Sequence, residues 1–275
     1  MENNAILSAL SARKSVRVFT PDPVTPDERA AILNAAFQAP TAGNQQLYTI
    51  LDITDPASPS LLWQISSATT GFSNLGFSYG RPVITKKENG TWVALLTSGY
   101  NNTSPGDGKG YLYVVNAATG EKISEIDTTV GNSTTPSGLA KISAWNDYGG
   151  INNTAGYVYG GDLLGNLWRF NINDETAFKL TALKDAEGNA QPVTTAPTLG
   201  LIKGHRIVFV GTGKYLEVSD LTDTSVQTVY AIKDNNVTET LENIRDDMVA
   251  QTMTEDGATR TGSNNSVDRS EEHTS

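Results

Sequence analysis

Two helical patterns and one strand pattern occupy the first part of the chain. Apolar residues recur at helical spacing over residues 6–10, and residues 13–19 then alternate polar with apolar side chains, which indicates an extended stretch. A second helix is predicted over residues 25–39, because Thr-Pro-Asp-Glu opens it with a capping sequence and Pro40 prevents its continuation. Residues 47–53 alternate in the manner of a strand.

After residue 58 the pattern changes to many short strands separated by Gly, Asn, Asp and Thr. Three groups of strands resemble one another, and each group has a proline-led strand, an apolar strand that ends in glycine, and an aromatic-aliphatic strand. The proline-led strands are 81–84, 136–140 and 196–199, the glycine-ended strands are 93–100, 157–162 and 207–213, and the aromatic strands are 111–116, 167–172 and 229–234.

Repeats of about 50 to 60 residues with three or four strands each are typical of β-propeller blades. The predicted fold class is therefore mostly β: a partial β-propeller of about three blades, preceded by a short fragment with helices and one strand. A β-sandwich whose strands resemble one another by coincidence remains the alternative.

The pattern change at residues 56–58 predicts a boundary between two unrelated segments. A third segment, 235–268, is polar and acidic and is predicted to be largely irregular, with one helical turn near residues 241–248. The last seven residues, 269–275, resemble the translation of a sequencing adapter. The division is 1–57, 58–234, 235–268 and 269–275, and we interpret the chain as an artefactual join, or chimera, of two interrupted genes.

Composition excludes several classes of function. The net charge of -10 and the pI near 4.7 argue against nucleic-acid binding, which needs clustered Lys and Arg. The absence of cysteine excludes disulfides, thiol nucleophiles and Cys-based zinc or iron-sulfur sites. No apolar run is long enough to span a membrane, and residues 1–10 lack the plan of a signal peptide. As written, the chain is expected to stay in the cytoplasm if it is expressed.

A basic cluster and a small-residue loop suggest a phosphate-bearing cofactor in the first segment. In an extended stretch Arg13, Ser15 and Arg17 share one face that could grip a phosphate, although such a cluster is also common on a solvated surface. The run 13–19 and the run 39–46 together resemble the start of the FMN-dependent nitroreductase family. The resemblance implies an α+β fold, a homodimer and FMN contacts from Arg13, Lys14, Ser15, Arg17, Pro40, Thr41, Ala42, Gly43 and Asn44.

The rest of the nitroreductase sequence is absent after residue 56. A protein contributes binding and orientation to flavin chemistry, so a fragment that lacks most of the pocket is not expected to bind FMN, to form the family's homodimer or to act as an enzyme. An NAD(P)H-dependent oxidoreductase with a C-terminal extension remains the alternative function.

Asp147, Asn152 and Asn153 are candidate calcium ligands in the second segment. Carboxylate and amide oxygens suit this hard cation, but only one of the three is acidic, and ordinary Asx turns would use the same residues. No cofactor, neither FMN nor calcium, is therefore expected in this chain.

Four motifs in order along residues 58–268 identify a second resemblance. They are 79–84, 98–102 with 108–113, 159–170 and 210–216. Together they are similar to the C-terminal β-propeller of the PilY-type adhesin and biogenesis factors of type IV pili. The resemblance implies a non-enzymatic function at the pilus or outer surface, in pilus assembly, adhesion and twitching motility, with minor pilus components and host or abiotic surfaces as partners. It also implies, in some members, a calcium loop near residues 146–156.

Overall fold

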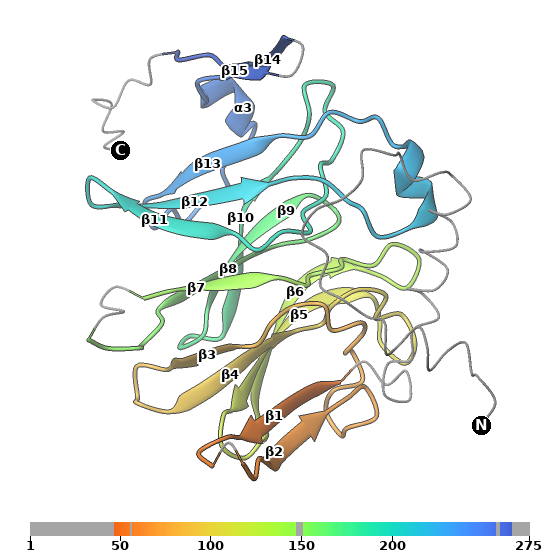
Figure 1. Cartoon of the computed structure of the whole chain (residues 1–275), viewed down its shortest axis with the longest axis vertical. Helices are drawn as coiled ribbons and strands as arrows, with labels where there is room; N and C mark the ends of the chain where they lie inside the picture. Colours follow the sequence, from red (N-terminus) through yellow and green to blue (C-terminus); the bar gives the residue numbers. More distant parts are fainter. Residues whose placement is uncertain (1–46, 56, 147–150, 257–258, 266–275) are drawn as a thin grey trace, which may run out of the picture. The chain divides into compact units, whose positions relative to one another are not determined.

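The computed structural model describes residues 47–55, 57–146, 151–256 and 259–265. Its elements are almost all strands in antiparallel sheets, which confirms the predicted mostly-β fold class (Figure 1). The two units of the chain, 1–45 and 46–275, divide close to the start of the described part. No helix among the described residues is long and apolar enough to cross a membrane.

A hairpin and three larger sheets follow one another along the chain. The hairpin joins β1 (Tyr48–Asp52) and β2 (Ser60–Ile65), and the first sheet has the order β3 (Val83–Lys86), β4 (Trp92–Thr97), β5 (Lys109–Asn116), β6 (Lys122–Gly131). The second sheet comprises β7 (Ile142–Trp145), β8 (Tyr157–Gly161), β9 (Asn166–Asn171) and β10 (Thr176–Ala182), and the third comprises β11 (Thr198–Ile202), β12 (His205–Gly211) and β13 (Val229–Asp234). The 3-10 helix η2 (Val218–Thr222), helix α3 (Ile244–Asp247) and the hairpin of β14 (Met253–Asp256) and β15 (Thr259–Gly262) complete the described part.

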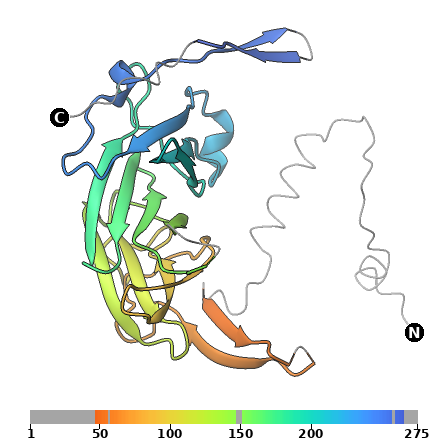
Figure 2. The ribbon, with the colours of Figure 1, turned by 90° about the vertical axis from the view of Figure 1, so that its left-hand side faces the viewer.

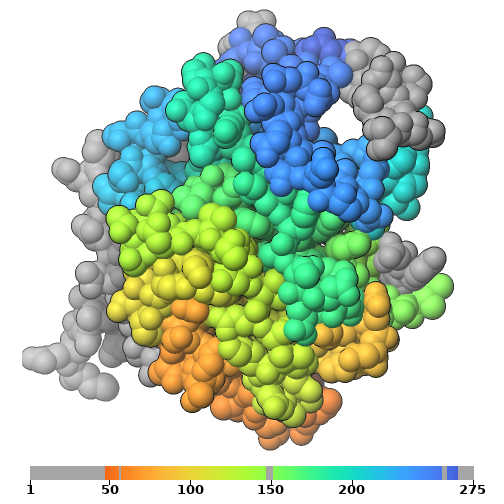
Figure 3. Space-filling model, turned by 180° about the vertical axis from the view of Figure 1, so that it is seen from behind, coloured from red at the N-terminus to blue at the C-terminus, as the bar shows by residue number. Residues whose placement is uncertain are grey.

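Three hydrophobic clusters join each sheet to the next. Residues of the β1–β2 hairpin pack on one face of β4 and β5, the opposite face of these strands packs on β8 and β9, and the far face of β8 and β9 packs on β12 and β13. The segments accordingly appear in sequence order from orange to blue in the space-filling view (Figure 3). Strands β4, β5 and β9 are buried on both faces, which explains why they read as continuous apolar runs.

Most predicted strands lie where the sequence pattern puts them, with one error in the second repeat. Residues 136–140 do not form the predicted proline-led strand, and the first strand of that sheet is instead β7. The backbone of Ser137 bonds to two loops instead of to a neighbouring strand: its N–H donates to Gly108 O at 2.8 Å and its carbonyl accepts from Leu163 N at 2.8 Å. These two bonds take the place of the inter-strand hydrogen bonds that a strand would make.

The strand predicted over residues 47–53 is present as β1, and its partner lies beyond the predicted boundary. Tyr48 pairs with Ile65, and Ile50 pairs with Trp63. Tyr48 is buried in the same cluster as Tyr113 of β5. The hairpin therefore shares a core with the β3–β6 sheet, whereas the four-part division of the chain remains a prediction.

The segment 235–268 is less irregular than its composition indicates. Helix α3 falls within the predicted turn 241–248, but β14 and β15 form a hairpin that the polar sequence does not suggest. Met253 is exposed and so are all four residues of β15, so the alternation of buried and exposed residues that would reveal a strand is missing.

Candidate functional site

The same pair of hydrogen bonds joins the second and third strands of all three larger sheets. A polar residue directly after the second strand donates its backbone N–H to the carbonyl of a residue at or near the start of the third strand, and its side-chain oxygen accepts that residue's own N–H, at 2.8 to 3.0 Å. The pairs are Ser98 with Tyr111, Asp162 with Asn166, and Thr212 with Thr228. We call this pair of hydrogen bonds the clamp, and it fixes the base of each connection whatever the length of that connection.

Two of these three connections are long. Residues 163–165 make a tight turn in the second sheet, whereas residues 99–108 in the first sheet and residues 213–227, which include η2, in the third form long connections. Because equivalent connections leave equivalent ends of the strands, both long loops lie at one edge, which we call the long-loop edge. Long loops on a rigid scaffold are where binding surfaces usually occur.

The loop 99–108 is held by buried polar groups. The Asn102 side chain is 2% exposed and donates to Asn74 O at 3.1 Å and to Lys109 O at 2.8 Å. The Tyr111 hydroxyl donates to Asp107 Oδ2 at 2.7 Å, and burial together with this carboxylate raises the pKa of Tyr111. The loop is therefore an ordered feature of the sheet edge.

The loop 213–227 is organised around one carboxylate. Asp220 Oδ2 accepts from the backbone N–H groups of Leu216 at 2.7 Å and Glu217 at 2.9 Å, and Lys214 Nζ lies 3.1 Å from Asp220 Oδ1. Burial alone would raise the pKa of Asp220, but these donors outweigh it and hold the pKa below the ordinary value of 3.8. The loop thus keeps a charged, hydrogen-bonded carboxylate at its base.

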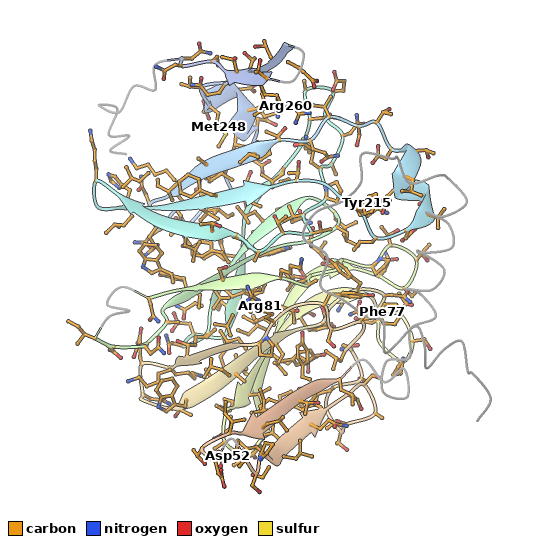
Figure 4. All side chains as sticks on the ribbon, viewed as in Figure 1. Asp52, Phe77, Arg81, Tyr215, Met248 and Arg260 are labelled. Carbon is orange, nitrogen blue, oxygen red and sulfur yellow. The ribbon has the colours of Figure 1, made fainter. Side chains whose placement is uncertain are left out.

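Aromatic side chains are exposed at the long-loop edge. Tyr215 is 67% exposed within the second loop, and Tyr79 is 62% exposed beside the first, where its ring contacts that of Tyr100 at 5.7 Å between centroids. Phe77 is tied to the first loop by its N–H, which donates to Tyr100 O at 2.7 Å, and Phe77 and Tyr215 lie on the same side of the sheets in Figure 4. Exposed aromatic rings on ordered loops are typical of protein recognition surfaces.

Tyr215 falls within the motif 210–216, but the sequence did not place it on a surface, and Asp220 lies in none of the motifs. The sequence feature that could have indicated this loop is the length of the polar run between the glycine-ended strand and the aromatic strand of the third repeat. That run is much longer than the one in the second repeat. A comparison of loop lengths at equivalent positions would have indicated the surface.

The predicted flavin contacts lie outside the described residues. Arg13, Lys14, Ser15 and Arg17, and also Pro40, Thr41, Ala42, Gly43 and Asn44, belong to the part of the chain that the structure leaves undescribed. The predicted absence of FMN binding therefore remains a prediction.

The calcium candidates are only partly described. Asp147 lies outside the described residues, Asn152 Oδ1 accepts from the Thr154 hydroxyl at 2.7 Å, and Asn153 Oδ1 accepts from Asn146 Nδ2 at 2.9 Å. The Asn153 carbonyl is also used, because it accepts from the Thr85 hydroxyl of β3 at 2.6 Å. Among the described residues no three His, Cys, Asp or Glu side chains gather to hold a metal ion. The two amide side chains thus bond to neighbouring side chains, and the Asn153 backbone carbonyl ties the segment to β3. The calcium candidates remain a prediction.

Buried polar groups also mark the contact between the second and third sheets. Arg169 Nη1 lies 2.6 Å from Asp234 Oδ1, and the Tyr159 hydroxyl donates to Asp234 Oδ2 at 2.5 Å. Asp234 is 2% exposed, and the Arg169 guanidinium also stacks on Phe178 at 4.7 Å from the ring centroid. This cluster links two sheets across their contact, and Asp234 also lines a shallow hollow with His205, Arg206 and Asn236.

These features define a class: a protein built from successive antiparallel sheets packed face to face, as in a β-propeller, with long loops at one edge of the described part. The family model for the PilY1 β-propeller domain matches residues 24–182. The chain belongs to the PilY1 β-propeller family. The match begins within the segment that resembles a nitroreductase, and none of the relatives named below is a flavin enzyme, so the nitroreductase alternative has no support from them.

Two bacterial proteins are similar in sequence to this chain. A type IV pilus biogenesis factor PilY1 homolog of Xylella fastidiosa (strain Temecula1) is 36% identical over 193 residues, which cover 68% of this chain and 15% of the relative. The type IV pilus biogenesis factor PilY1 of Pseudomonas aeruginosa (strain PAO1) is 34% identical over 224 residues, covering 70% of this chain and 18% of the relative. The chain thus spans less than a fifth of the length of these relatives.

A solved structure shares the fold. The crystal structure of the Pseudomonas aeruginosa PilY1 C-terminal domain superposes with a TM-score of 0.67 at 28% sequence identity. The alignment covers 82% of this chain and 53% of that chain. The resemblance to the PilY type is therefore confirmed.

Proposed function

We propose that this chain is a non-enzymatic segment of a type IV pilus biogenesis factor that acts at the cell surface by contact with other proteins. The observation that carries the proposal is the PilY1 family match over residues 24–182, together with relatives named for pilus biogenesis. Because the chain spans only a part of those relatives, the activity belongs to the longer protein and this segment contributes one surface to it.

The long-loop edge is the proposed contact surface. It presents Tyr215 on one loop whose base is held by hydrogen bonds and Tyr79 beside the other, so that little conformational entropy is lost when a partner binds. Minor pilus components are the proposed partners, and adhesion to a host or abiotic surface would use the same exposed rings.

The proposal is tested by segment exchange. Residues 58–268 would replace the matching residues of Pseudomonas aeruginosa PilY1, and surface pili would be measured by shearing and by twitching motility. We expect the exchanged protein to support pili, and Tyr215→Ala to reduce them several-fold. Leu201→Ala is the matched control, because Leu201 is 64% exposed on β11, outside the long loops.

Two results would count against this proposal. An exchanged protein that is stable and secreted but gives no pili would refute the pilus function of the segment. Equal effects of Tyr215→Ala and Leu201→Ala would refute the assignment of the contact to the long-loop edge.

A further inference from the structure

Strand β12 carries Arg206 at the end opposite the long-loop edge. The strand runs from His205 to Gly211, and the long loop follows Gly211. The Arg206 side chain lies on the same face of the strand as Val208 and Val210, which are buried against the second sheet. Figures 1 and 2 show the β7–β10 and β11–β13 sheets as neighbours in the series of sheets. Arg206 therefore belongs to the contact between two sheets of the described part.

Aromatic rings of the second sheet orient the Arg206 guanidinium. Its Cζ atom lies 4.7 Å from the centroid of the Tyr157 ring and 6.0 Å from the centroid of the Trp145 ring. Arg169 Cζ lies 5.2 Å from the centroid of the same Tyr157 ring. A guanidinium that is stacked on a ring keeps its N–H groups in its own plane, where they can bind an acceptor. Stacking thus fixes the plane of Arg206 and leaves its edge for hydrogen bonding.

This edge of the guanidinium has an unsatisfied donor. Arg206 Nη2 donates to Asn236 Oδ1, whereas Arg206 Nε is buried and has no hydrogen-bond partner among the described residues. Nε and Nη2 lie on one side of a guanidinium with parallel N–H groups, so together they fit the two oxygens of a carboxylate. The amide of Asn236 offers a single, uncharged oxygen. A buried donor without an acceptor is unfavourable, and a second acceptor oxygen would relieve it.

Positive charge is in excess beside this edge. Asp234 Oδ1 lies 2.6 Å from Arg169 Nη1 and also accepts from the backbone N–H of Asn236 at 2.9 Å. Asp234 Oδ2 accepts from the Tyr159 hydroxyl at 2.5 Å. Asp234 is therefore occupied by other donors, and no acidic side chain of the described residues forms an ion pair with Arg206. Two guanidinium groups thus share the surroundings of one carboxylate.

Arg206 and its acceptor Asn236 both line a hollow of about 270 Å³. The pockets that hold small-molecule ligands usually have about 300–1,000 Å³, so the hollow is of a size for one side chain rather than for a larger group. The Tyr157 ring already contacts both guanidinium groups, and so it does not offer a free face on which a sugar could stack. An acidic side chain of a polypeptide therefore fits this hollow better than an acidic sugar does.

We propose that the hollow binds the carboxylate of an aspartate or glutamate side chain from a partner protein. The carboxylate displaces the Asn236 amide and accepts from Nε and Nη2 of Arg206. A carboxylate is a stronger acceptor for a guanidinium than an amide is, and two parallel hydrogen bonds fix its orientation. The site lies at the other end of β12 from the long-loop edge and does not depend on a pilus function.

NMR titration of the whole chain tests the site with two matched probes. N-acetylglutamate α-amide carries only the side-chain carboxylate, and N-acetylglutamine α-amide is its neutral counterpart. At constant ionic strength we expect the Nε–H signal of Arg206 and the backbone amide signal of Asn236 to shift saturably with the first probe and to stay unchanged with the second. General attraction of anions is not expected to mimic this result, because the chain has a net charge of -10.

Three variants separate the guanidinium fork from charge alone. Arg206→Lys keeps the charge but removes the fork, so the affinity for the first probe should fall about tenfold. Lys203→Gln is the matched control, because Lys203 is exposed on the same β11–β12 turn but does not line the hollow, and the affinity should not change. Asn236→Gly removes the competing amide and suits the left-handed backbone at this position, where φ is 59°, so the affinity should rise several-fold.

Four results would each overturn the proposal. They are the absence of a saturable shift with N-acetylglutamate α-amide, equal losses of affinity in Arg206→Lys and Lys203→Gln, a lower affinity in Asn236→Gly, and tighter binding of glucuronate than of the first probe. Circular dichroism would establish that each variant is folded. If Arg206→Lys were not folded, the gain expected for Asn236→Gly would still decide the question.

Discussion

Substitution of Asp234 by asparagine tests whether the contact between the second and third sheets depends on a buried ion pair. The change keeps the side-chain volume but removes the negative charge that faces Arg169 at 2.6 Å. The Arg169 side chain is only 9% exposed, so its guanidinium would remain buried without a counterion. Removal of one partner from such a pair costs about 3–5 kcal/mol.

Two further contacts set the size of the expected loss. The Tyr159 hydroxyl now donates to Asp234, and Arg169 Nη2 also donates to Val237 O at 2.7 Å. The second contact survives Asp234→Asn and partly satisfies the guanidinium, so we expect a loss near the lower end, about 3 kcal/mol. Tyr159→Phe should cost about 1.5–3 kcal/mol, because it removes one hydrogen bond to a charged group.

Urea unfolding followed by tryptophan fluorescence measures these changes at low protein concentration. Arg169→Met combined with Asp234→Asn should be less destabilising than the sum of the two single changes, because no charge is then left buried. Glu255→Gln is the control, since the Glu255 and Arg260 side chains are 67% and 68% exposed and such pairs contribute about 0–1 kcal/mol. A loss for Asp234→Asn no larger than that of the control would refute the reasoning.

Three other predictions address the core, the long-loop edge and the calcium candidates. Phe170→Ala should lower the free energy of unfolding by about 3–5 kcal/mol, because Phe170 is 0% exposed between two sheets. Val229→Ala should change the free energy of unfolding by less than about 0.5 kcal/mol, because Val229 is 80% exposed. Urea unfolding midpoints would compare the two variants, and similar losses would contradict the packing described. Because the pKa of Asp220 is lowered in the folded state, Asp220 stabilises the fold above its ordinary pKa of 3.8, and this stabilisation is lost as the pH falls through the lower pKa of the folded state. The amide NMR signals of Leu216 and Glu217, which donate to Asp220, should follow this titration. They should not follow it in Asp220→Asn. Addition or chelation of calcium should leave the melting temperature unchanged, and a calcium-dependent rise that Asp147→Asn abolishes would show that the loop binds the ion after all.

The sequence predicted the sheets better than it predicted their boundaries. Apolar runs such as 93–97 and 111–116 are buried on both faces, and only a strand between two packed sheets, or a buried helix, would carry such a pattern. Residues 136–140 misled the prediction because Pro136 and the apolar Leu139 suggest a strand start. The backbone of Ser137 is instead hydrogen-bonded to two loops. The boundary at 56–58 was predicted from a change in sequence pattern, yet Tyr48 before it and Trp63 after it lie in the same hydrophobic cluster.

Local sequence thus determined which residues form strands and that the strands repeat, since a period of two and a recurrent order of strand types are properties of the chain itself. Only the tertiary structure decided which faces are covered. Leu167 and Val229 both stand among the apolar residues that begin an aromatic strand, but one is buried and the other is 80% exposed. Burial depends on whether a neighbouring sheet is present, and the residues of a strand do not indicate whether such a sheet packs on it. The same holds for the long-loop edge, whose position follows from how equivalent strand ends are brought to one side.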